Sequence, residues 1–268
     1  MTSLRHPLPA SGLPPETLTE LTAELSARHP TSAARFVSHL VSDRDPAAAL
    51  GRHVETVVFG ETFGNGPALL AEEYAEHEAH SVFAVTLDLH RQTVAGTFRL
   101  IVTGSKLSGL KSLADLAAAP WHTPPEEVLD RMDPDQRPQP GRTWDAATLA
   151  VLRDYRSSAV GPGVAFALYQ TVHTAAAAAG CLWAVAILDE RPLELVQRSL
   201  RRPFQPYPGI AAGRYLDSPS SLPVWADLAR WRAETRQAAP ELYRTVVEGA
   251  PFDPTFELAA FAALPTAG

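Results

Sequence analysis

The sequence predicts a layered α/β fold (α+β layered), in which a mixed central β-sheet is flanked by helices. Two β-rich runs, over 81–89 and 93–102, are separated by only three residues, which is typical of a β-hairpin. A third strand is predicted over 143–152. A glycine turn, an alanine-rich helix over 164–179 and a strand over 181–188 follow it. We expect the last two strands to lie nearly parallel, joined by a right-handed crossover.

The composition excludes a wholly disordered chain and some classes of partner. Of the 268 residues, 46% are hydrophobic and 20% are charged, as in ordinary globular proteins. The net charge of −7 argues against a nucleic-acid binder that relies on bulk positive charge. The one cysteine, Cys181, excludes an intrachain disulfide framework and a cysteine-based zinc finger. A single cysteine fits a reducing compartment, so we expect a cytoplasmic protein. Because the net charge is negative, we expect no nucleic-acid partner.

The N-terminal part of the chain is predicted to be mainly helical. Residues 1–15 contain four prolines and no apolar core of a secretory signal. The spacing of Leu18, Leu21 and Leu25 predicts a helix over 17–29, and a second helix is expected over about 32–42. The spacing of the apolar residues over 54–59 fits either a helix or a strand. The segment 68–80 is acidic and helix-prone.

The remaining elements follow the hairpin. A helix is predicted over 107–119, and the six prolines of 120–142 predict the longest irregular connection. An amphipathic helix is expected over 191–201, an irregular to extended segment over 204–216, and helices over 225–237 and 241–248. The division that we expect is a helical arm over 1–50, a main domain over 51–230 and a helical extension over 231–268.

The run from Ser157 to Leu188 contains no Asp, Glu, Lys or Arg, and it exceeds the roughly 20 residues of a membrane helix. Gly180 divides it, however, into a helix-like half and a strand-like half. Glutamine, histidine and many alanines also lower its hydrophobicity. We therefore expect a buried helix and a buried strand, and no membrane span.

Five segments resemble one branch of the GCN5-related N-acetyltransferase (GNAT) superfamily, that of the acyl-homoserine-lactone synthases and the long-chain N-acyl amino acid synthases. They are VVFGETFG at 57–64, AEEYAEHE at 71–78, VAGTFRLIVTG at 94–104, TWDAATLAV at 143–151 and RYLDSPSSLPVW at 214–225. The resemblance covers about 54–228. It implies a GNAT-like fold and an N-acyltransferase that uses an acyl-CoA or acyl-carrier-protein thioester as donor and the amine of a small molecule as acceptor.

The chain departs from the family at two positions. The arginine of the family's strand falls on Thr148, which puts a contact with the substrate in doubt. The first position of the family's pyrophosphate motif, glutamine or arginine, falls on Ser158.

The turn Gly161–Pro162–Gly163 is the candidate phosphate site. Backbone N–H groups at the start of a helix can hold a pyrophosphate, because glycines allow close approach and the helix dipole favours anions. Pro162 has no N–H group, so Gly161, Gly163 and Val164 would supply the donors, and Arg156 would add positive charge. The alternative is a tight turn without a ligand.

Acyl transfer to an amine needs a base for the amine and an acid for the departing thiolate. The candidate catalytic residues are Asp145, Glu61 and Glu73; for Asp145, capping of a neighbouring element is an equal alternative. Arg99, an arginine inside an apolar strand, either lies on a solvated face or binds an anionic substrate group. Phe98 and Trp144 are grouped with Arg99 as candidate substrate-binding residues. The strand segment from Trp144 to Ala150 is expected to supply the N–H group that stabilises the oxyanion.

No metal site is expected. His77-Glu78-Ala79-His80 is one residue short of the H-E-x-x-H zinc motif, and a solvated acidic face accounts for it. Cys181 is expected to be an inert core thiol.

Two further functions stay open beside the acyltransferase. The lactone synthases use S-adenosylmethionine, so a relative that performs another reaction on this ligand is an alternative. A GNAT-like binding protein without catalysis is the other, because Thr148 and Ser158 replace the family's residues.

Overall fold

The computed structural model describes residues 12–28, 34–103, 106–156 and 163–250. Contacts between Cα atoms divide the chain into two compact units. The first unit comprises residues 1–100 and 148–172, and the second comprises 101–147 and 173–268. The boundaries that the sequence suggests, at residues 50 and 230, differ from this division and stay a prediction.

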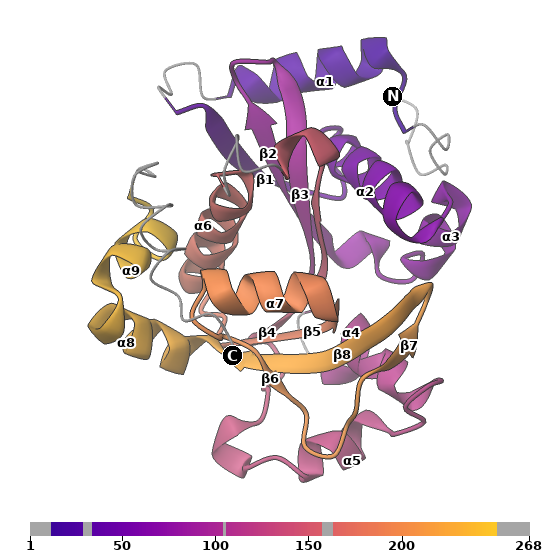
Figure 1. Cartoon of the computed structure of the whole chain (residues 1–268), viewed down its shortest axis with the longest axis vertical. Helices are drawn as coiled ribbons and strands as arrows, with labels where there is room; N and C mark the ends of the chain where they lie inside the picture. Colours follow the sequence, from indigo (N-terminus) through magenta and orange to yellow (C-terminus); the bar gives the residue numbers. More distant parts are fainter. Residues whose placement is uncertain (1–11, 29–33, 104–105, 157–162, 251–268) are drawn as a thin grey trace. The chain divides into compact units, whose positions relative to one another are not determined.

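Helices and strands are interspersed along the described residues (Figure 1). The α-helices are α1 (Pro15–Ser26), α2 (Ala48–Phe63), α3 (Pro67–Glu73), α4 (Lys111–Ala114), α5 (Pro125–Asp130), α6 (Gly163–Ala178), α7 (Glu190–Ser199), α8 (Leu228–Ala238) and α9 (Pro240–Val246). The strands are β1 (Phe36–Ser42), β2 (Ser81–Asp88), β3 (Thr93–Ile101), β4 (Thr143–Val151), β5 (Trp183–Asp189), β6 (Gln205–Pro206), β7 (Gly213–Tyr215) and β8 (Ser218–Asp227). Short 3-10 helices are η1 (Glu78–His80), η2 (Leu107–Gly109), η3 (Asp115–Ala117), η4 (Pro134–Gln136) and η5 (Arg153–Tyr155).

The eight strands of the described residues are hydrogen-bonded in the order β1-β2-β3-β4-β5-β8-β6, and β7 pairs with β8. β1 runs antiparallel to β2, β4 parallel to β5, and β5 antiparallel to β8. The predicted mixed sheet, its hairpin and its parallel pair are therefore confirmed. The parallel pairing is short, because it joins only Thr143–Asp145 to Trp183–Val185.

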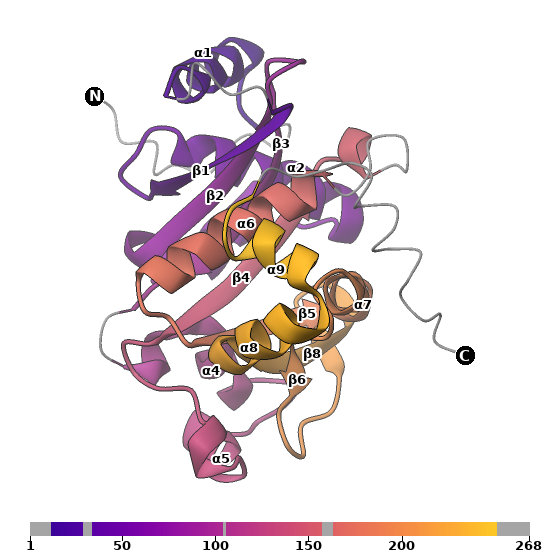
Figure 2. The ribbon, with the colours of Figure 1, turned by 90° about the vertical axis from the view of Figure 1, so that its left-hand side faces the viewer.

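The core of the first unit lies on both faces of β2. Phe83 belongs to a buried cluster with Leu50 and Val54 of α2, whereas the next residue, Ala84, belongs to a cluster with Leu168 of α6. Successive side chains of a strand point to opposite faces. The helix α2 and the first part of α6 therefore cover opposite faces of the strands in this unit (Figure 2).

Gly96 in β3 allows α6 to approach the sheet closely. A Cβ atom at this position would lie 2.7 Å from Cγ1 of Val164 and 3.1 Å from the carbonyl oxygen of Ala150. Replacing Gly96 with alanine is expected to lower the free energy of unfolding by about 1–3 kcal/mol, because an overpacked core must shift. Urea denaturation measures the change. Gly66→Ala, where a Cβ would meet nothing within 4 Å, is the control, and equal losses in both variants would contradict the close approach.

The core of the second unit also lies on both faces of its strands. Val185 of β5 belongs to a buried cluster with Leu113 of α4 and Val128 of α5. The preceding residue, Ala184, packs on the other face against a cluster that contains Leu228 of α8. One face of this part of the sheet is thus covered by the short helices that follow residue 106, and the other by α8.

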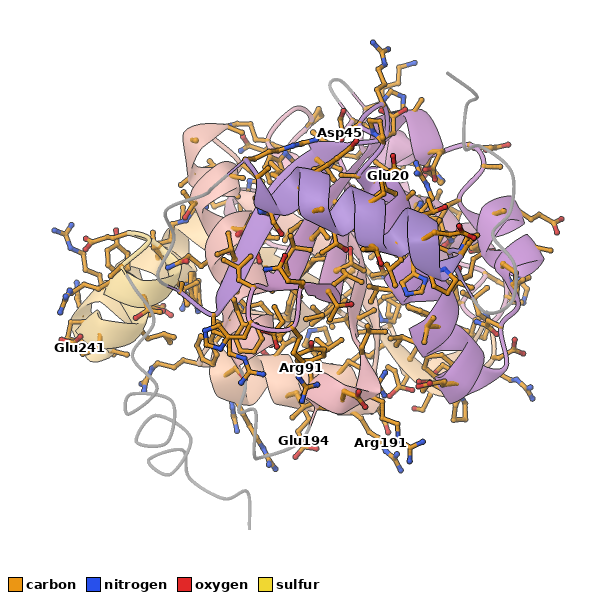
Figure 3. All side chains as sticks on the ribbon, turned by 90° about the horizontal axis from the view of Figure 1, so that it is seen from above. Glu20, Asp45, Arg91, Arg191, Glu194 and Glu241 are labelled. Atoms are coloured by element: carbon orange, nitrogen blue, oxygen red, sulfur yellow. The ribbon has the colours of Figure 1, made fainter. Side chains whose placement is uncertain are left out.

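The helix α7 has the amphipathic pattern that the sequence predicts over 191–201. Val196 is buried, whereas Leu195 is exposed and Arg191 and Glu194 project away from the helix into the surroundings (Figure 3). Asp189 begins the helix, because its side chain accepts a hydrogen bond from the N–H group of Arg191 at 3.0 Å.

The predicted helix over 32–42 is wrong in its described part. Residues 36–42 form β1, which pairs with β2 over seven positions. His39 and Val41 are buried while Leu40 and Ser42 are exposed, which is the period of a strand rather than a helix. The backbone hydrogen bonds of β2 determine the conformation here, and local propensity does not reveal such a partner.

The predicted helix over 225–237 begins too early. Its first three residues end β8, and α8 begins at Leu228. The physical reason is Asp227, whose side chain caps the helix by accepting a hydrogen bond from the N–H group of Arg230 at 2.9 Å. Residues 54–59, left undecided by their period, lie in α2, and the proline-rich connection 120–142 contains α5 and η4.

Of the charge-free run from Ser157 to Leu188, residues 163–178 form α6 and residues 183–188 lie in β5. Within the ranges that the structure describes, no helix is both long and apolar enough to cross a membrane.

Candidate functional site

Asp145, the last residue of β4 that pairs with β5, is the centre of the candidate site in the second unit. Its side chain is fully buried. Oδ2 accepts a hydrogen bond from the backbone N–H of Ser112 at 2.6 Å, and Oδ1 accepts one from Oγ of Ser112 at 2.7 Å. The carboxylate therefore caps the first turn of α4, which is one of the two roles that the sequence leaves open.

Burial raises the pKa of Asp145 to about 6, against the two hydrogen bonds from Ser112, which lower it. The nearby charge of Lys111 also lowers this pKa, and that of Asp115 raises it. A carboxyl group with a pKa of about 6 is mostly ionised at pH 7 and exchanges its proton near neutrality. That is the property required of a general base that works near pH 7.

A lysine–aspartate–tyrosine cluster begins at Lys111, the residue that precedes Ser112 in the chain. Nζ of Lys111 lies 2.5 Å from Oδ2 of Asp115 and 2.8 Å from the hydroxyl of Tyr215. The same hydroxyl donates to Oδ2 of Asp115 at 2.5 Å. The side chain of Lys111 is only 5% exposed, so its charge is held inside the unit by these partners.

Aromatic side chains lie on the face of the sheet to which the side chain of Asp145 points. Asp145 pairs with Val185 of β5, and Val185 pairs with Trp225 of β8. Trp183 precedes Val185 by two residues in β5, so its side chain points to the same face. These two tryptophans and Tyr207 belong to one buried cluster. Burial, with the charge of Asp145, raises the pKa of Tyr207 well above its usual value, so this hydroxyl keeps its proton at neutral pH.

Trp144 lies on the opposite face of β4. It is half-buried and packs against the cluster that contains Cys181 and Leu228. The thiol of Cys181 is buried, burial raises its pKa, and Sγ lies 3.2 Å from the carbonyl oxygen of Trp183. This agrees with the expectation of an inert core thiol.

Arg99 is the centre of a buried ion cluster in the first unit. Nε and Nη2 donate to the two carboxylate oxygens of Glu55 at 2.9 and 2.6 Å, and Nη1 donates to Oε2 of Glu78 at 2.9 Å. The guanidinium carbon also lies 4.1 Å from the ring centroid of Tyr74 and 4.6 Å from that of Phe83. The side chain is 3% exposed, so the group neither lies on a solvated face nor is available without displacing a carboxylate of the protein itself.

Further contacts complete the cluster. Nε of Arg52 donates to Oε1 of Glu78 at 2.7 Å, and the hydroxyl of Thr148 donates to Oε1 of Glu55. Burial alone would lower the pKa of Arg99 and raise that of Glu78. The opposite charges prevail, so the pKa of Arg99 lies above and that of Glu78 below its usual value. Thr148, the residue at the position of the family's arginine, thus hydrogen-bonds a carboxylate that Arg99 already neutralises.

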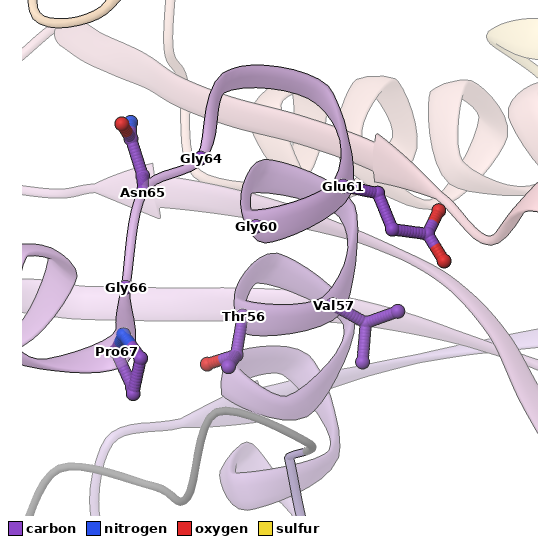
Figure 4. A pocket seen from close by; sticks show the side chains of 8 residues that line it. All are labelled: Thr56, Val57, Gly60, Glu61, Gly64, Asn65, Gly66 and Pro67. Carbon is purple, nitrogen blue, oxygen red and sulfur yellow. The ribbon is translucent and has the colours of Figure 1, made fainter.

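The remaining predicted residues of the first unit are dispersed. Phe98 is half-buried and packs against the cluster that contains Leu168 of α6. Glu61 is exposed on α2 and lines an open pocket (Figure 4). Glu73 is half-buried at the end of α3.

The predicted phosphate turn lies largely outside the described residues, since Gly161 is not among them. Gly163 and Val164 begin α6, and the side chain of Val164 is buried. Nε of Arg156 donates to the carbonyl oxygen of Val151 at 2.6 Å. Among the described residues, no group of three or more His, Cys, Asp or Glu side chains is arranged to hold a metal ion.

Sequence reasoning missed Ser112, Lys111, Asp115 and Glu55. The i, i+4 spacing of Lys111 and Asp115 was a usable signal of an ion pair on one helical face. Glu55 gave a weaker one, because a carboxylate among the apolar residues of α2 needs a partner.

The sheet order and its flanking helices define a GNAT-like acyltransferase fold, as predicted. No family model matches the sequence, and no curated protein matches it by sequence. The structure is similar to that of FeeM, an N-acyl amino acid synthase from uncultured soil microbes, with a TM-score of 0.51 and 14% identity over 76% of this chain and 97% of that chain. It is also similar to BjaI, a CoA-dependent acyl-homoserine lactone synthase solved with SAM and isopentyl-CoA, with a TM-score of 0.49 and 14% identity over 74% of this chain and 89% of that one. At these identities the likeness is one of fold.

Proposed function

We propose that the protein is an N-acyltransferase that moves an acyl group from a thioester, of CoA or of an acyl carrier protein, to the amine of a small molecule in the cytoplasm. The observation that carries the proposal is Asp145, a buried carboxylate with a pKa of about 6 in a GNAT-like fold. Fold alone does not fix a reaction, whereas a carboxylate that exchanges its proton near neutral pH can act as a base.

In the proposed reaction, the amine nitrogen attacks the thioester carbonyl carbon and forms the amide bond, while the C–S bond breaks. The amine loses one proton and the departing thiolate gains one, so the reaction needs no other reactant. Asp145 takes the proton of the amine. Each of its oxygens accepts one hydrogen bond from Ser112 and retains a second lone pair for this purpose. A backbone N–H group of the strand segment from Trp144 to Ala150 stabilises the oxyanion.

The pyrophosphate of the CoA donor is assigned to the start of α6. The N–H groups of Gly161, Gly163 and Val164 are the proposed donors, with Arg156 as the nearby positive charge. Arg99, with Phe98 and Trp144, stays the proposal for contacts to the substrate, and Arg99 would have to exchange Glu55 or Glu78 for a substrate anion.

The test is an assay of free-thiol release from acyl-CoA thioesters in the presence of a panel of amines, with Asp145→Asn as the variant. Asparagine keeps an acceptor for the N–H group of Ser112 but cannot take a proton. We expect kcat to fall by about 10²–10⁴-fold, the range of general-base catalysis, while circular dichroism stays unchanged. Asp130→Asn, at an exposed aspartate of the same unit, is the matched control.

An Asp145→Asn variant with wild-type turnover would leave Asp145 as a capping residue only and contradict the assigned base. Calorimetric titration with acyl-CoA and S-adenosylmethionine covers the other functions. Binding of S-adenosylmethionine without acyl transfer would favour an enzyme that performs another reaction on that ligand, and binding without turnover of any substrate would favour a binding protein.

A further inference from the structure

Ser112 supplies both hydrogen bonds that the Asp145 carboxylate accepts from the described residues. Its backbone N–H group donates to one carboxylate oxygen at 2.6 Å, and its hydroxyl donates to the other at 2.7 Å. Ser112 belongs to α4, which has only four residues, and so short a helix has little stability of its own. The place of Ser112 beside the carboxylate therefore depends on the contacts that anchor α4 to the rest of the second unit.

The side chain of Lys111 anchors the first turn of α4 to β7. Nζ of Lys111 donates to the hydroxyl of Tyr215 at 2.8 Å, and this hydroxyl donates to Oδ2 of Asp115 at 2.5 Å. Nζ also lies 2.5 Å from the same carboxylate oxygen, so the three side chains form a closed ring of hydrogen bonds. Lys111 and Asp115 come from α4 and η3, and Tyr215 is the member of the ring that comes from the sheet. Because the side chain of Lys111 is buried, bulk water cannot replace a contact that is lost there.

Tyr215 belongs to the same sheet as Asp145. It pairs with Ser218 of β8, β8 pairs with β5, and β5 pairs with β4 at Asp145. The hydroxyl of Tyr215 thus closes a loop of contacts that leads from the sheet through α4 back to Asp145. The ring of Tyr215 also packs against that of Trp121, with the two centroids 5.5 Å apart. Phenylalanine keeps this ring contact, so the role of the hydroxyl can be separated from that of the ring.

We propose that Tyr215 is a positioning residue for Asp145, because its hydroxyl fixes the first turn of α4 and thereby holds Ser112 against the carboxylate. Hydrogen bonds to the charged form of a carboxyl group lower its pKa, so loosening Ser112 should raise the pKa of Asp145. The consequence for catalysis rests on the proposed function, whereas the contact itself does not.

Three titratable groups act on the Asp145 carboxylate from the elements around it. The charge of Lys111 lowers its pKa and that of Asp115 raises it, and the hydroxyl of Tyr207 lies near enough to be affected by it in turn. Replacing Tyr215 with phenylalanine leaves all three groups in the chain and the ion pair of Lys111 with Asp115 intact. A change in the titration of Asp145 would therefore report the position of Ser112.

The first test follows the protonation of Asp145 without any assay of activity. The protein is labelled with ¹³C at the side-chain carboxyl group of aspartate, and the NMR signal that Asp145→Asn removes is followed as a function of pH. We expect Tyr215→Phe to move the midpoint upward by about 0.5 pH units, and Ser112→Ala, which deletes one hydrogen bond outright, by about 1 pH unit. Tyr243→Phe, the same change at a half-buried tyrosine of α9, should leave the midpoint unchanged.

The double variant Tyr215→Phe/Ser112→Ala shows whether Tyr215 acts through Ser112. If it does, the double variant should move the midpoint by less than the sum of the two single changes, because the hydroxyl that Tyr215 holds in place is already gone. Circular dichroism checks that each variant folds. A midpoint in Tyr215→Phe that equals that of the wild type, or two changes that add in full, overturns the proposal.

The effect on catalysis is read from the pH profile of kcat for amide formation. A general base acts only when it is ionised, so kcat of Tyr215→Phe should fall about twofold at pH 6 and approach the wild-type value at pH 8. An equal loss at both pH values would indicate a general distortion and contradict the positioning role. If the NMR midpoint moves as expected while the wild type acylates no amine, the proposed reaction fails and the positioning of Asp145 stands.

Discussion

Replacing Arg99 with methionine is expected to lower the free energy of unfolding by about 3–5 kcal/mol, the largest stability effect that we predict for a single side chain. The change leaves Glu55, which is 2% exposed, without its cationic partner, and leaves Glu78 with Arg52 alone. Methionine fills a similar volume, so the loss reports the uncompensated charge rather than a cavity. Urea denaturation followed by circular dichroism measures the effect.

Arg28→Met is the matched control for this experiment. Arg28 also forms an ion pair, with Asp45 at 2.6 Å, but its side chain is 44% exposed. Water solvates the exposed charges, so we expect a loss below about 1 kcal/mol. Equal losses for Arg28→Met and Arg99→Met would contradict the view that the Arg99 cluster is a buried element of the fold. A substrate role alone would lower activity in Arg99→Met and leave stability nearly unchanged.

The second large effect that we predict is a dependence of the free energy of unfolding on pH, which arises from Asp145. Its pKa is raised from 3.8 to about 6 in the folded protein, so the folded state binds more protons than the unfolded state between these values. Stability therefore falls as the pH rises from about 4 to about 6, and stays lower above that window. Since one pKa unit corresponds to 1.36 kcal/mol, the full contribution is about 3 kcal/mol.

Asp145→Asn isolates this contribution, because Glu78 and other carboxyls with lowered pKa values titrate equally in both proteins. We expect the variant to gain about 3 kcal/mol relative to the wild type between pH 4 and pH 7. Denaturation curves at several pH values give the difference directly. A difference that does not change with pH would show that Asp145 titrates at its ordinary value.

The part of the fold that sequence predicts well has strong local signals. The two β-rich runs over 81–89 and 93–102, with only three residues between them, predicted the hairpin, and the glycine turn before an alanine-rich segment predicted α6 and β5. The strand β1 was missed because its hydrogen-bond partners in β2 lie far along the chain: Phe36 pairs with Asp88. Local propensity carries no information about a partner at that separation.

The residues of the candidate site were likewise predicted only in part. Arg99 was identified because an arginine inside an apolar strand is unusual, and Asp145 because it lies on the predicted strand that precedes the glycine turn. Their partners were not, since Glu55 lies 44 residues from Arg99 and Ser112 lies 33 residues from Asp145. Tertiary packing joins these pairs, and a single sequence records neither the distance nor the burial that gives each charge its effect.

The burial of Cys181 has a practical consequence for spectroscopy. It is the only cysteine in the sequence, and its thiol is enclosed in the core with a pKa raised by burial. Maleimides and other thiol reagents attack the exposed thiolate, so the native protein should take up very little label. A cysteine introduced at an exposed position, such as Glu194 on α7, would then carry a fluorophore or spin label at a single defined place. The wild-type chain is thus ready for site-specific labelling without first removing a cysteine of its own.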